Sequence, residues 1–414
     1  MNGWEAGEMA TVRRVLLGLT AGGLLAASAA FLGAAYFARQ VVVPKTMRKE
    51  DLRIRRVFRG ADGELLIELP ASPQTTAPGR YSIWFANGSG HACVGPVVAS
   101  DPRTATVTRA VDRVDSGDLL SARAGIWSGY VFSKPEQLGL PFCDVEIPVE
   151  GGVAPAWRFE PAEGSAKPNA WAIHIHGMGG KRAGALRGVP VAVRSGYTSL
   201  VVSFRNDGDA PPSPDGRYTL GQTEWLDVEA AVEYALDEGA QQIVLFGWSL
   251  GGSIALRLAD LSAYSDRIAG LVLDAPVLDW ATTLTANACS SGLPRSISSL
   301  GLRMLQSQTL RWAAGLEHSL DLAQLDWLDR AAEIEKPTLV LHGQADPSTP
   351  FHVSRQFADR RPDLVQLVSF DAEGHSHEWN VDWKRWDDAS VAWLALTSTH
   401  FFDLPEKPAK VWDH

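Results

Sequence analysis

Short apolar runs alternate with amphipathic stretches through the second half of the chain. The runs have the composition of buried strands and stand at residues 171–176, 198–204, 242–246, 271–274, 338–341 and 365–370. Apolar residues recur at helical spacing between them, at residues 183–195, 224–236, 250–260 and 387–396. Strands that alternate with helices imply right-handed crossovers and a doubly wound, mainly parallel sheet. We therefore predict an α/β domain over residues 143–400, opened by a hairpin at residues 144–149 and 156–160.

The alternation breaks between about residues 280 and 333, where the sequence is helix-prone and rich in Leu, Ala and Trp. In a doubly wound fold, an insertion at this point stands near the carboxyl edge of the sheet, where ligands bind. We therefore predict a helical lid over that edge.

Residues 51–142 show a different pattern, with weak helical periodicity and frequent Gly and Pro. Short β-segments are expected at residues 64–69, 81–85, 104–108 and 129–132. Turn signals such as Asp62-Gly63 and Asn87-Gly88 separate them. This range is predicted to form a small β-rich module, to which the sequence assigns no protein partner.

The segment over residues 15–38 contains no charged residue and follows a tail over residues 1–14. As a helix it would be roughly 36 Å long, enough to cross a hydrocarbon core of about 30 Å. A cleaved signal peptide is the alternative, because Arg13 and Arg14 precede the segment and Ala27-Ser28-Ala29 resembles a cleavage site. The apolar run continues past that site, which favours an uncleaved transmembrane helix.

A basic segment over residues 39–59 follows, with eight Lys and Arg residues against Glu50 and Asp51. Because Lys and Arg next to a membrane span tend to stay in the cytoplasm, the predicted single-pass protein would keep its large domain there. The segment is also suited to contact anionic lipid head groups.

Composition narrows the class of protein further. The 414-residue chain carries a net charge of −10, which argues against a nucleic-acid surface over the whole chain. Its three cysteines, Cys93, Cys143 and Cys289, form no C-x-x-C pair, so a thiolate zinc site is not expected, although one disulfide stays open. Residues 401–414 are predicted to be a C-terminal tail.

The strongest local signal is Gly247-Trp248-Ser249-Leu250-Gly251. It follows a predicted strand and opens a predicted helix, which is the context that the G-x-S-x-G nucleophile elbow requires. Such a turn exposes the serine hydroxyl at the sheet edge, and the glycines let chain and helix approach closely. Ser249 is therefore the predicted nucleophile.

A nucleophilic serine needs a base and an orienting acid, which follow the serine in the order acid, then histidine, in this topology. Asp346 comes just after the strand at residues 338–341, and His375 follows the strand at residues 365–370. Asp274, at the end of another strand, is the alternative acid. His377 is the alternative base, although Gly374 favours presentation of the His375 ring.

Two backbone N–H groups are expected to bind an oxyanion. One is that of Leu250, directly after the nucleophile, and the other is that of Met178 in the loop after residues 171–176. His174 and His176 alternate along that strand like a metal pair. Without a third ligand at suitable spacing, they are interpreted as core or loop histidines.

These motifs together resemble the α/β-hydrolase superfamily, with the closest branch similar to the prolyl-oligopeptidase-like and membrane-anchored α/β-hydrolases of actinobacterial type. The resemblance covers about residues 143–400 and rests on His176-Gly177, Gly247-x-Ser249-x-Gly251-Gly252, His342-Gly343-x-x-Asp346 and Gly374-His375. It implies a triad of Ser249, Asp346 and His375, and an oxyanion hole at Met178 and Leu250. The chain departs from the family pattern at Phe204-Arg205-Asn206-Asp207-Gly208 and at Thr349, where an apolar residue is usual.

The predicted function is a serine hydrolase that cleaves a carboxylic ester or related acyl bond in a small or lipid-like substrate, without metal or organic cofactor. A serine peptidase or amidase is the second hypothesis. A non-catalytic, membrane-tethered scaffold that binds a partner through residues 51–142 is the third, but it has no need of three ordered triad residues.

Overall fold

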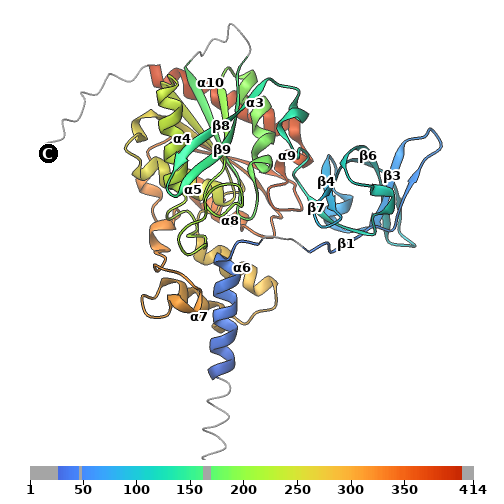
Figure 1. Ribbon diagram of the computed structural model, residues 1–414, viewed down its shortest axis with the longest axis horizontal. Helices are drawn as coiled ribbons and strands as arrows, with labels where there is room; N and C mark the ends of the chain where they lie inside the picture. The colour runs from blue at the N-terminus through green and yellow to red at the C-terminus, as the bar shows by residue number, and fades with distance from the viewer. Residues whose placement is uncertain (1–26, 46–48, 162–168, 403–414) are drawn as a thin grey trace, which may run out of the picture.

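The computed structural model describes residues 27–45, 49–161 and 169–402, which form two separate sheets with helices around the second (Figure 1). The first sheet belongs to the predicted β-rich module and the second to the predicted α/β domain. Both sheets follow from the hydrophobic pattern of their strands.

The module is a seven-stranded antiparallel sheet in the order β1-β7-β4-β5-β6-β3-β2. Its strands are β1 (Leu52–Arg53), β2 (Arg56–Arg59), β3 (Leu65–Pro70), β4 (Tyr81–Phe85), β5 (Gly90–Asp101), β6 (Thr106–Ser116) and β7 (Ala124–Ser128), with short helices α2 (Pro73–Thr76), η1 (Leu119–Ser121) and η2 (Pro135–Leu138). Ile67, Leu69, Tyr81, Ile83 and Phe85 recur every second residue and share one buried core.

The strands β1 and β2 lie where the predicted basic segment over residues 39–59 overlaps the predicted module over residues 51–142. One predicted strand differs from the structure. The predicted strand at residues 129–132 is absent: β7 ends at Ser128, and the Gly129 carbonyl accepts a hydrogen bond from Asn380 instead of continuing the ladder.

The second sheet has eight strands in the order β15-β14-β13-β12-β10-β11-β9-β8. They are β8 (Phe142–Val149), β9 (Gly152–Phe159), β10 (Ala170–Ile175), β11 (Thr198–Val202), β12 (Gln242–Trp248), β13 (Ile268–Asp274), β14 (Thr338–Gly343) and β15 (Val365–Phe370). The strands β10 to β15 are parallel, and the hairpin β8–β9 adds antiparallel strands at one edge. The doubly wound, mainly parallel sheet is confirmed.

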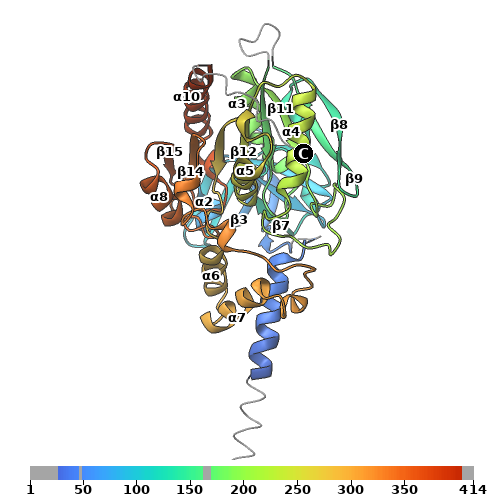
Figure 2. The ribbon, with the colours of Figure 1, turned by 90° about the vertical axis from the view of Figure 1, so that its left-hand side faces the viewer.

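Helices cover both faces of this sheet (Figure 2). They are α3 (Val189–Arg194), α4 (Trp225–Asp237), α5 (Leu250–Leu261), α8 (Phe351–Arg360), α9 (Glu378–Val381) and α10 (Trp383–Phe402). Along β10, Trp171 and Ile173 join the core under α4 and α5, whereas Ala170 and Ala172 join the core under α3 and α10. The helix expected at residues 183–195 begins as the 3₁₀-helix η3 (Arg182–Gly188).

The insertion after β13 is helical, as predicted from its composition. It contains α6 (Trp280–Ser290), α7 (Arg295–Gln306) and the short 3₁₀-helices η5 (Arg311–Ala313), η6 (Ala323–Leu325) and η7 (Ala331–Glu333). Its role as a lid stays a prediction.

The N-terminal helix spans residues 27–42 and lies beside α7 in both views (Figures 1 and 2). Ala34 and Ala38 are fully buried, and Phe37 packs against Gly301 of α7. Residues 15–26 of the predicted transmembrane segment lie outside the described residues. Within the described ranges, no helix combines the length and the hydropathy that crossing a bilayer requires.

Candidate active site

Ser249 occupies a sharp turn between β12 and α5, with φ 54° and ψ −113°. This conformation is strained for a residue with a side chain, and the surroundings hold it in place. The Ser249 N–H donates to the Asp274 carbonyl at 3.0 Å. A Cβ at Gly247 would lie 2.5 Å from the Gly251 carbonyl oxygen, and one at Gly251 would lie 2.2 Å from that of Ile175. The turn therefore requires both glycines of the motif.

The structure brings Ser249, His375 and Asp346 together in one hydrogen-bonded chain. His375 Nε2 lies 2.7 Å from Ser249 Oγ, and His375 Nδ1 lies 2.8 Å from Asp346 Oδ2. These residues come from the ends of β12, β14 and β15, which meet at one edge because the strands are parallel. The geometry is that of a nucleophile, base and orienting acid.

Asp346 is held firmly in the ionised form. Its Oδ1 accepts hydrogen bonds from the N–H groups of Ser348 and Thr349, at 2.7 and 2.9 Å. Burial alone would raise the pKa of Asp346, but the charge of His375 and the hydrogen bonds from His342 and His375 outweigh it. The pKa of this carboxyl is therefore well below its usual range.

The sequence analysis did not predict that two further residues support Asp346. Thr349 Oγ1 donates to Asp346 Oδ2 at 2.9 Å, so the hydroxyl has a polar role where the family pattern has an apolar residue. His342 Nε2 lies 3.5 Å from the same oxygen, and its Nδ1 lies 2.7 Å from Ser354 Oγ. Both residues lie within four positions of Asp346, and this spacing is the feature of the sequence that could have indicated their role.

The alternative acid, Asp274, and the alternative base, His377, have surroundings that differ from those of Asp346 and His375. Asp274 is buried beside the elbow and accepts a hydrogen bond from Trp386 Nε1 at 2.8 Å. The His377 ring lies edge-on to Tyr81, with centroids 5.2 Å apart. Burial and the charge of Arg187 lower the pKa of His377 to about 3, so this ring stays neutral. Neither rival makes the hydrogen bonds that link Asp346, His375 and Ser249.

The loop expected to supply an oxyanion donor lies against the nucleophile. A Cβ at Gly177 would lie 3.3 Å from Ser249 Cβ, and the Gly180 N–H closes a turn on the Gly177 carbonyl at 3.1 Å. Met178 lies within this turn, and Leu250 is the first residue of α5. The structure thus places Met178 and Leu250 next to Ser249, while their role as donors stays a prediction.

The two histidines of β10 and its following loop have partners within the fold. The His174 ring packs beside the rings of Phe246 and Trp248, with centroids 4.7 and 6.0 Å away, and burial lowers the pKa of His174 to about 3. The His176 Nε2 lies 3.2 Å from Asp207 Oδ2. Among the described residues, no group of three or more His, Cys, Asp or Glu side chains could hold a metal ion.

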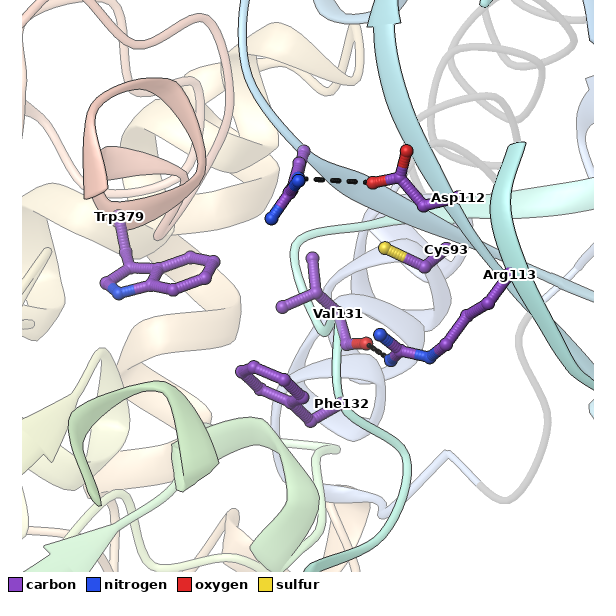
Figure 3. Close-up of a pocket in the computed structure, with 7 residues that line it drawn as sticks. Cys93, Asp112, Arg113, Val131, Phe132 and Trp379 are labelled. Carbon is purple, nitrogen blue, oxygen red and sulfur yellow. Dashed lines mark hydrogen bonds and ion pairs between the residues drawn. The ribbon is translucent and has the colours of Figure 1, made fainter. Parts of the chain in front are cut away.

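A cavity of about 410 Å³ opens at the junction of the module and the α/β domain (Figure 3). It is lined by Arg80, Cys93, Asp112, Arg113, Val131, Phe132 and Trp379. Burial raises the pKa of the Cys93 thiol to about 11, and Cys93, Cys143 and Cys289 are all free thiols. No triad residue lines this cavity, but Trp379 lies on α9, just after the His375 loop.

Comparisons with known families agree with this architecture. A family model described as alpha/beta hydrolase fold matches residues 173–288, and one described as a domain of unknown function (DUF8805) matches residues 53–128. The first match, the doubly wound sheet and the nucleophile elbow all lie in the second half of the chain, and together they support an α/β-hydrolase fold for this domain.

Several solved structures are similar in fold. An esterase of Pyrococcus furiosus is 21% identical over 64% of this chain and 94% of its own, with a TM-score of 0.48. A thermostable carboxylesterase from a metagenomic library is 19% identical over 63% and 89%, with a TM-score of 0.44. The acylaminoacyl peptidase of Pyrococcus horikoshii is 14% identical over 87% and 57%, with a TM-score of 0.44.

Proposed function

We propose that the protein is a serine hydrolase that cleaves a carboxylic ester or related acyl bond through an acyl-enzyme on Ser249. The observation that carries this proposal is the hydrogen-bonded chain from Ser249 through His375 to Asp346, at 2.7 and 2.8 Å. The strained turn between β12 and α5 holds Ser249 within hydrogen-bond distance of His375.

In the proposed reaction, His375 Nε2 takes the proton of Ser249 as the hydroxyl oxygen attacks the carbonyl carbon. Asp346, ionised because of its depressed pKa, fixes the ring with Nδ1 protonated and stabilises the imidazolium that forms. His375 then gives the proton to the leaving group, and water releases the acyl group by the same steps.

The negative charge that develops on the carbonyl oxygen needs donors placed in advance. We propose the N–H groups of Met178 and Leu250, aided by the positive end of the α5 dipole. Each such donor contributes about 10²-fold or more to the rate. No step requires a metal or an organic cofactor.

An ester or lipid-like substrate is proposed ahead of an amide, because the chain combines the apolar N-terminal segment with the helical insertion after β13. Parallel assays with short p-nitrophenyl acyl esters and aminoacyl amides separate these substrate classes. Faster turnover of the amides would favour the peptidase.

The mechanism itself is tested with a fluorophosphonate probe, which forms a covalent bond with an activated serine. We expect the wild-type chain to be labelled and Ser249→Ala to remain unlabelled, as read by gel fluorescence and by mass spectrometry of the modified peptide. An unlabelled wild type, or equal labelling of Ser249→Ala, would contradict the mechanism.

A further inference from the structure

The β-rich module is hydrogen-bonded to the segment that follows His375. Asn380, on α9, donates from Nδ2 to the carbonyl of Arg80 at 2.7 Å and to that of Gly129 at 2.9 Å. The Arg80 N–H donates back to the Asn380 carbonyl at 3.2 Å. Arg80 precedes β4 and Gly129 follows β7, so one side chain joins two segments of the module. Asn380 is almost fully buried.

The same asparagine is linked to the catalytic loop through Arg187. One nitrogen of that guanidinium, Nη1, donates to Asn380 Oδ1 at 2.7 Å and to the Ser376 carbonyl at 2.8 Å. Ser376 directly follows His375. A continuous path of hydrogen bonds therefore runs from the module, through Asn380 and Arg187, to the backbone next to His375.

This backbone is in a conformation that must be held. Ser376 has a φ of 54°, in the left-handed region that residues with a side chain seldom adopt. Such a residue persists only where its surroundings determine it. The Arg187 bond to its carbonyl is one of those determinants, and Asn380 orients Arg187.

The fit between the module and this loop is close. A Cβ at Gly79 would lie 1.8 Å from the Asn380 carbonyl oxygen. A Cβ at Gly129 would lie 2.7 Å from Asn380 Oδ1 and 2.9 Å from His377 Cδ2. Tyr81 packs its ring against His377 on the same side. The module therefore requires glycine at both positions where it meets this loop.

The module also reaches the loop of the proposed oxyanion hole. A Cβ at Gly180 would lie 2.7 Å from the Tyr130 hydroxyl, and a Cβ at Gly184 would lie 2.6 Å from the same ring. The Arg187 guanidinium lies 5.9 Å from the centre of the Tyr130 ring. Module residues thus contact both loops that flank Ser249.

We infer that the β-rich module completes the active site, and that Asn380 is the positioning residue through which docking of the module sets the His375 loop. The inference rests on the proposed serine-hydrolase function, and it gives a role to residues 53–128, which match a domain of unknown function. Asn380 acts on the reaction through Arg187, Ser376 and His375, without contact with the reacting atoms.

The test is Asn380→Asp in the full chain. The carboxylate keeps the size of the amide and its bond to Arg187, but it cannot donate to the carbonyls of Arg80 and Gly129. We expect kcat for a p-nitrophenyl ester, per folded molecule, to fall about 10- to 100-fold, because small misplacement of a catalytic group is costly. KM should stay within about twofold, since no substrate contact is removed.

Two further variants separate positioning from stability. Asn380→Ser keeps one donor, so its kcat should lie between those of wild type and Asn380→Asp. If Asn380→Asp does not fold, the kcat of Asn380→Ser tests the positioning role instead. Ser262→Ala removes a hydrogen bond to Glu229 of 2.6 Å at the far end of α5 and should lower the melting temperature without changing kcat. Folded fractions are measured by circular dichroism at the assay temperature.

The outcomes are distinct. One outcome is that wild type is labelled by the fluorophosphonate and that both Asn380 variants keep the wild-type kcat with a lowered melting temperature. The contact between the module and the His375 loop would then be only structural, and the inference would be wrong. If wild type is not labelled at all, the proposed function itself fails. The inference is supported if kcat and the labelling rate fall moderately in Asn380→Ser and further in Asn380→Asp.

Discussion

At the scale of single residues, two carboxylates compete for the role of triad acid, and their surroundings differ sharply. Asp346 is bonded to His375 and to two backbone N–H groups, whereas Asp274 accepts from Trp386. Chain order alone admits both. The structure separates them because only the loop after β14 brings its carboxylate to the histidine.

Replacement of the acid by its amide is therefore predicted to have a large effect at one position only. Asp346→Asn should lower kcat about 10³- to 10⁴-fold, because the amide favours the wrong histidine tautomer. Asp274→Asn keeps an acceptor for Trp386 and should lower kcat less than about tenfold. Steady-state kinetics with one ester substrate compare the pair, and a larger loss for Asp274→Asn would assign the acid to the other strand.

At the scale of elements, the nucleophile elbow and the helix α9 both carry side chains of the site, but only the elbow shows a pattern in the sequence. The elbow was predictable, because a strand, a serine between glycines and a helix are all visible in the sequence. The four-residue α9 was not, since it is too short to show periodicity. It nevertheless carries Glu378, Trp379 and Asn380 to the junction.

Within α9, Glu378 is fully buried, and Gly343 N–H donates to its Oε1 at 2.7 Å. Burial and the charges of Asp274 and Asp346 raise its pKa well above 4.5. The folded state therefore binds a proton that the unfolded chain has lost. This contribution to stability is complete below the unfolded pKa and is lost as the pH rises toward the folded pKa.

Glu378→Gln imitates the protonated form and removes that dependence. Relative to wild type, the variant should gain about 1.4 kcal/mol in free energy of unfolding per pH unit above the unfolded pKa. Urea unfolding of both proteins at about pH 5 and pH 8 measures the difference. A difference that stays constant with pH would show that Glu378 is ionised in the folded protein.

At the scale of the whole molecule, the N-terminal helix over residues 27–42 packs one face against the α/β domain and leaves another face exposed. Ala34 and Ala38 face the protein, while Leu32 and Tyr36 are each 67% exposed. The uncharged residues 15–26 precede them. We propose that the protein associates with a membrane through residues 15–38, with the catalytic domain on the cytoplasmic side.

Membrane fractionation tests this proposal. The full chain should stay in the membrane pellet after a carbonate wash, and Leu16→Asp with Leu19→Asp should move to the supernatant, because each Asp costs about 2.5–3.5 kcal/mol in a membrane-embedded helix. Wild type in the supernatant would contradict the membrane proposal. A C-terminal reporter active only outside the cytoplasm would contradict the proposed side.

The sequence by itself determined the class of fold and the candidates for the triad. Periodicity predicts which segments are strands and helices, and parallel strands must present their carboxyl ends at one edge, so Ser249, Asp346 and His375 were expected to converge. These inferences need only the local pattern of apolar residues and the order of the motifs along the chain. Both can be seen in the sequence without knowledge of tertiary contacts.

Only the tertiary structure decided which groups surround those residues. The path from the module through Asn380 and Arg187 joins residues distant in sequence, and the burial of Glu378 results from packing around a helix too short to show periodicity. The contacts of Thr349 and His342 with Asp346 depend on how the loop after β14 folds. Such contacts depend on how two sheets and their loops pack in space. The relation between the β-rich module and the His375 loop is therefore a property of the assembled fold.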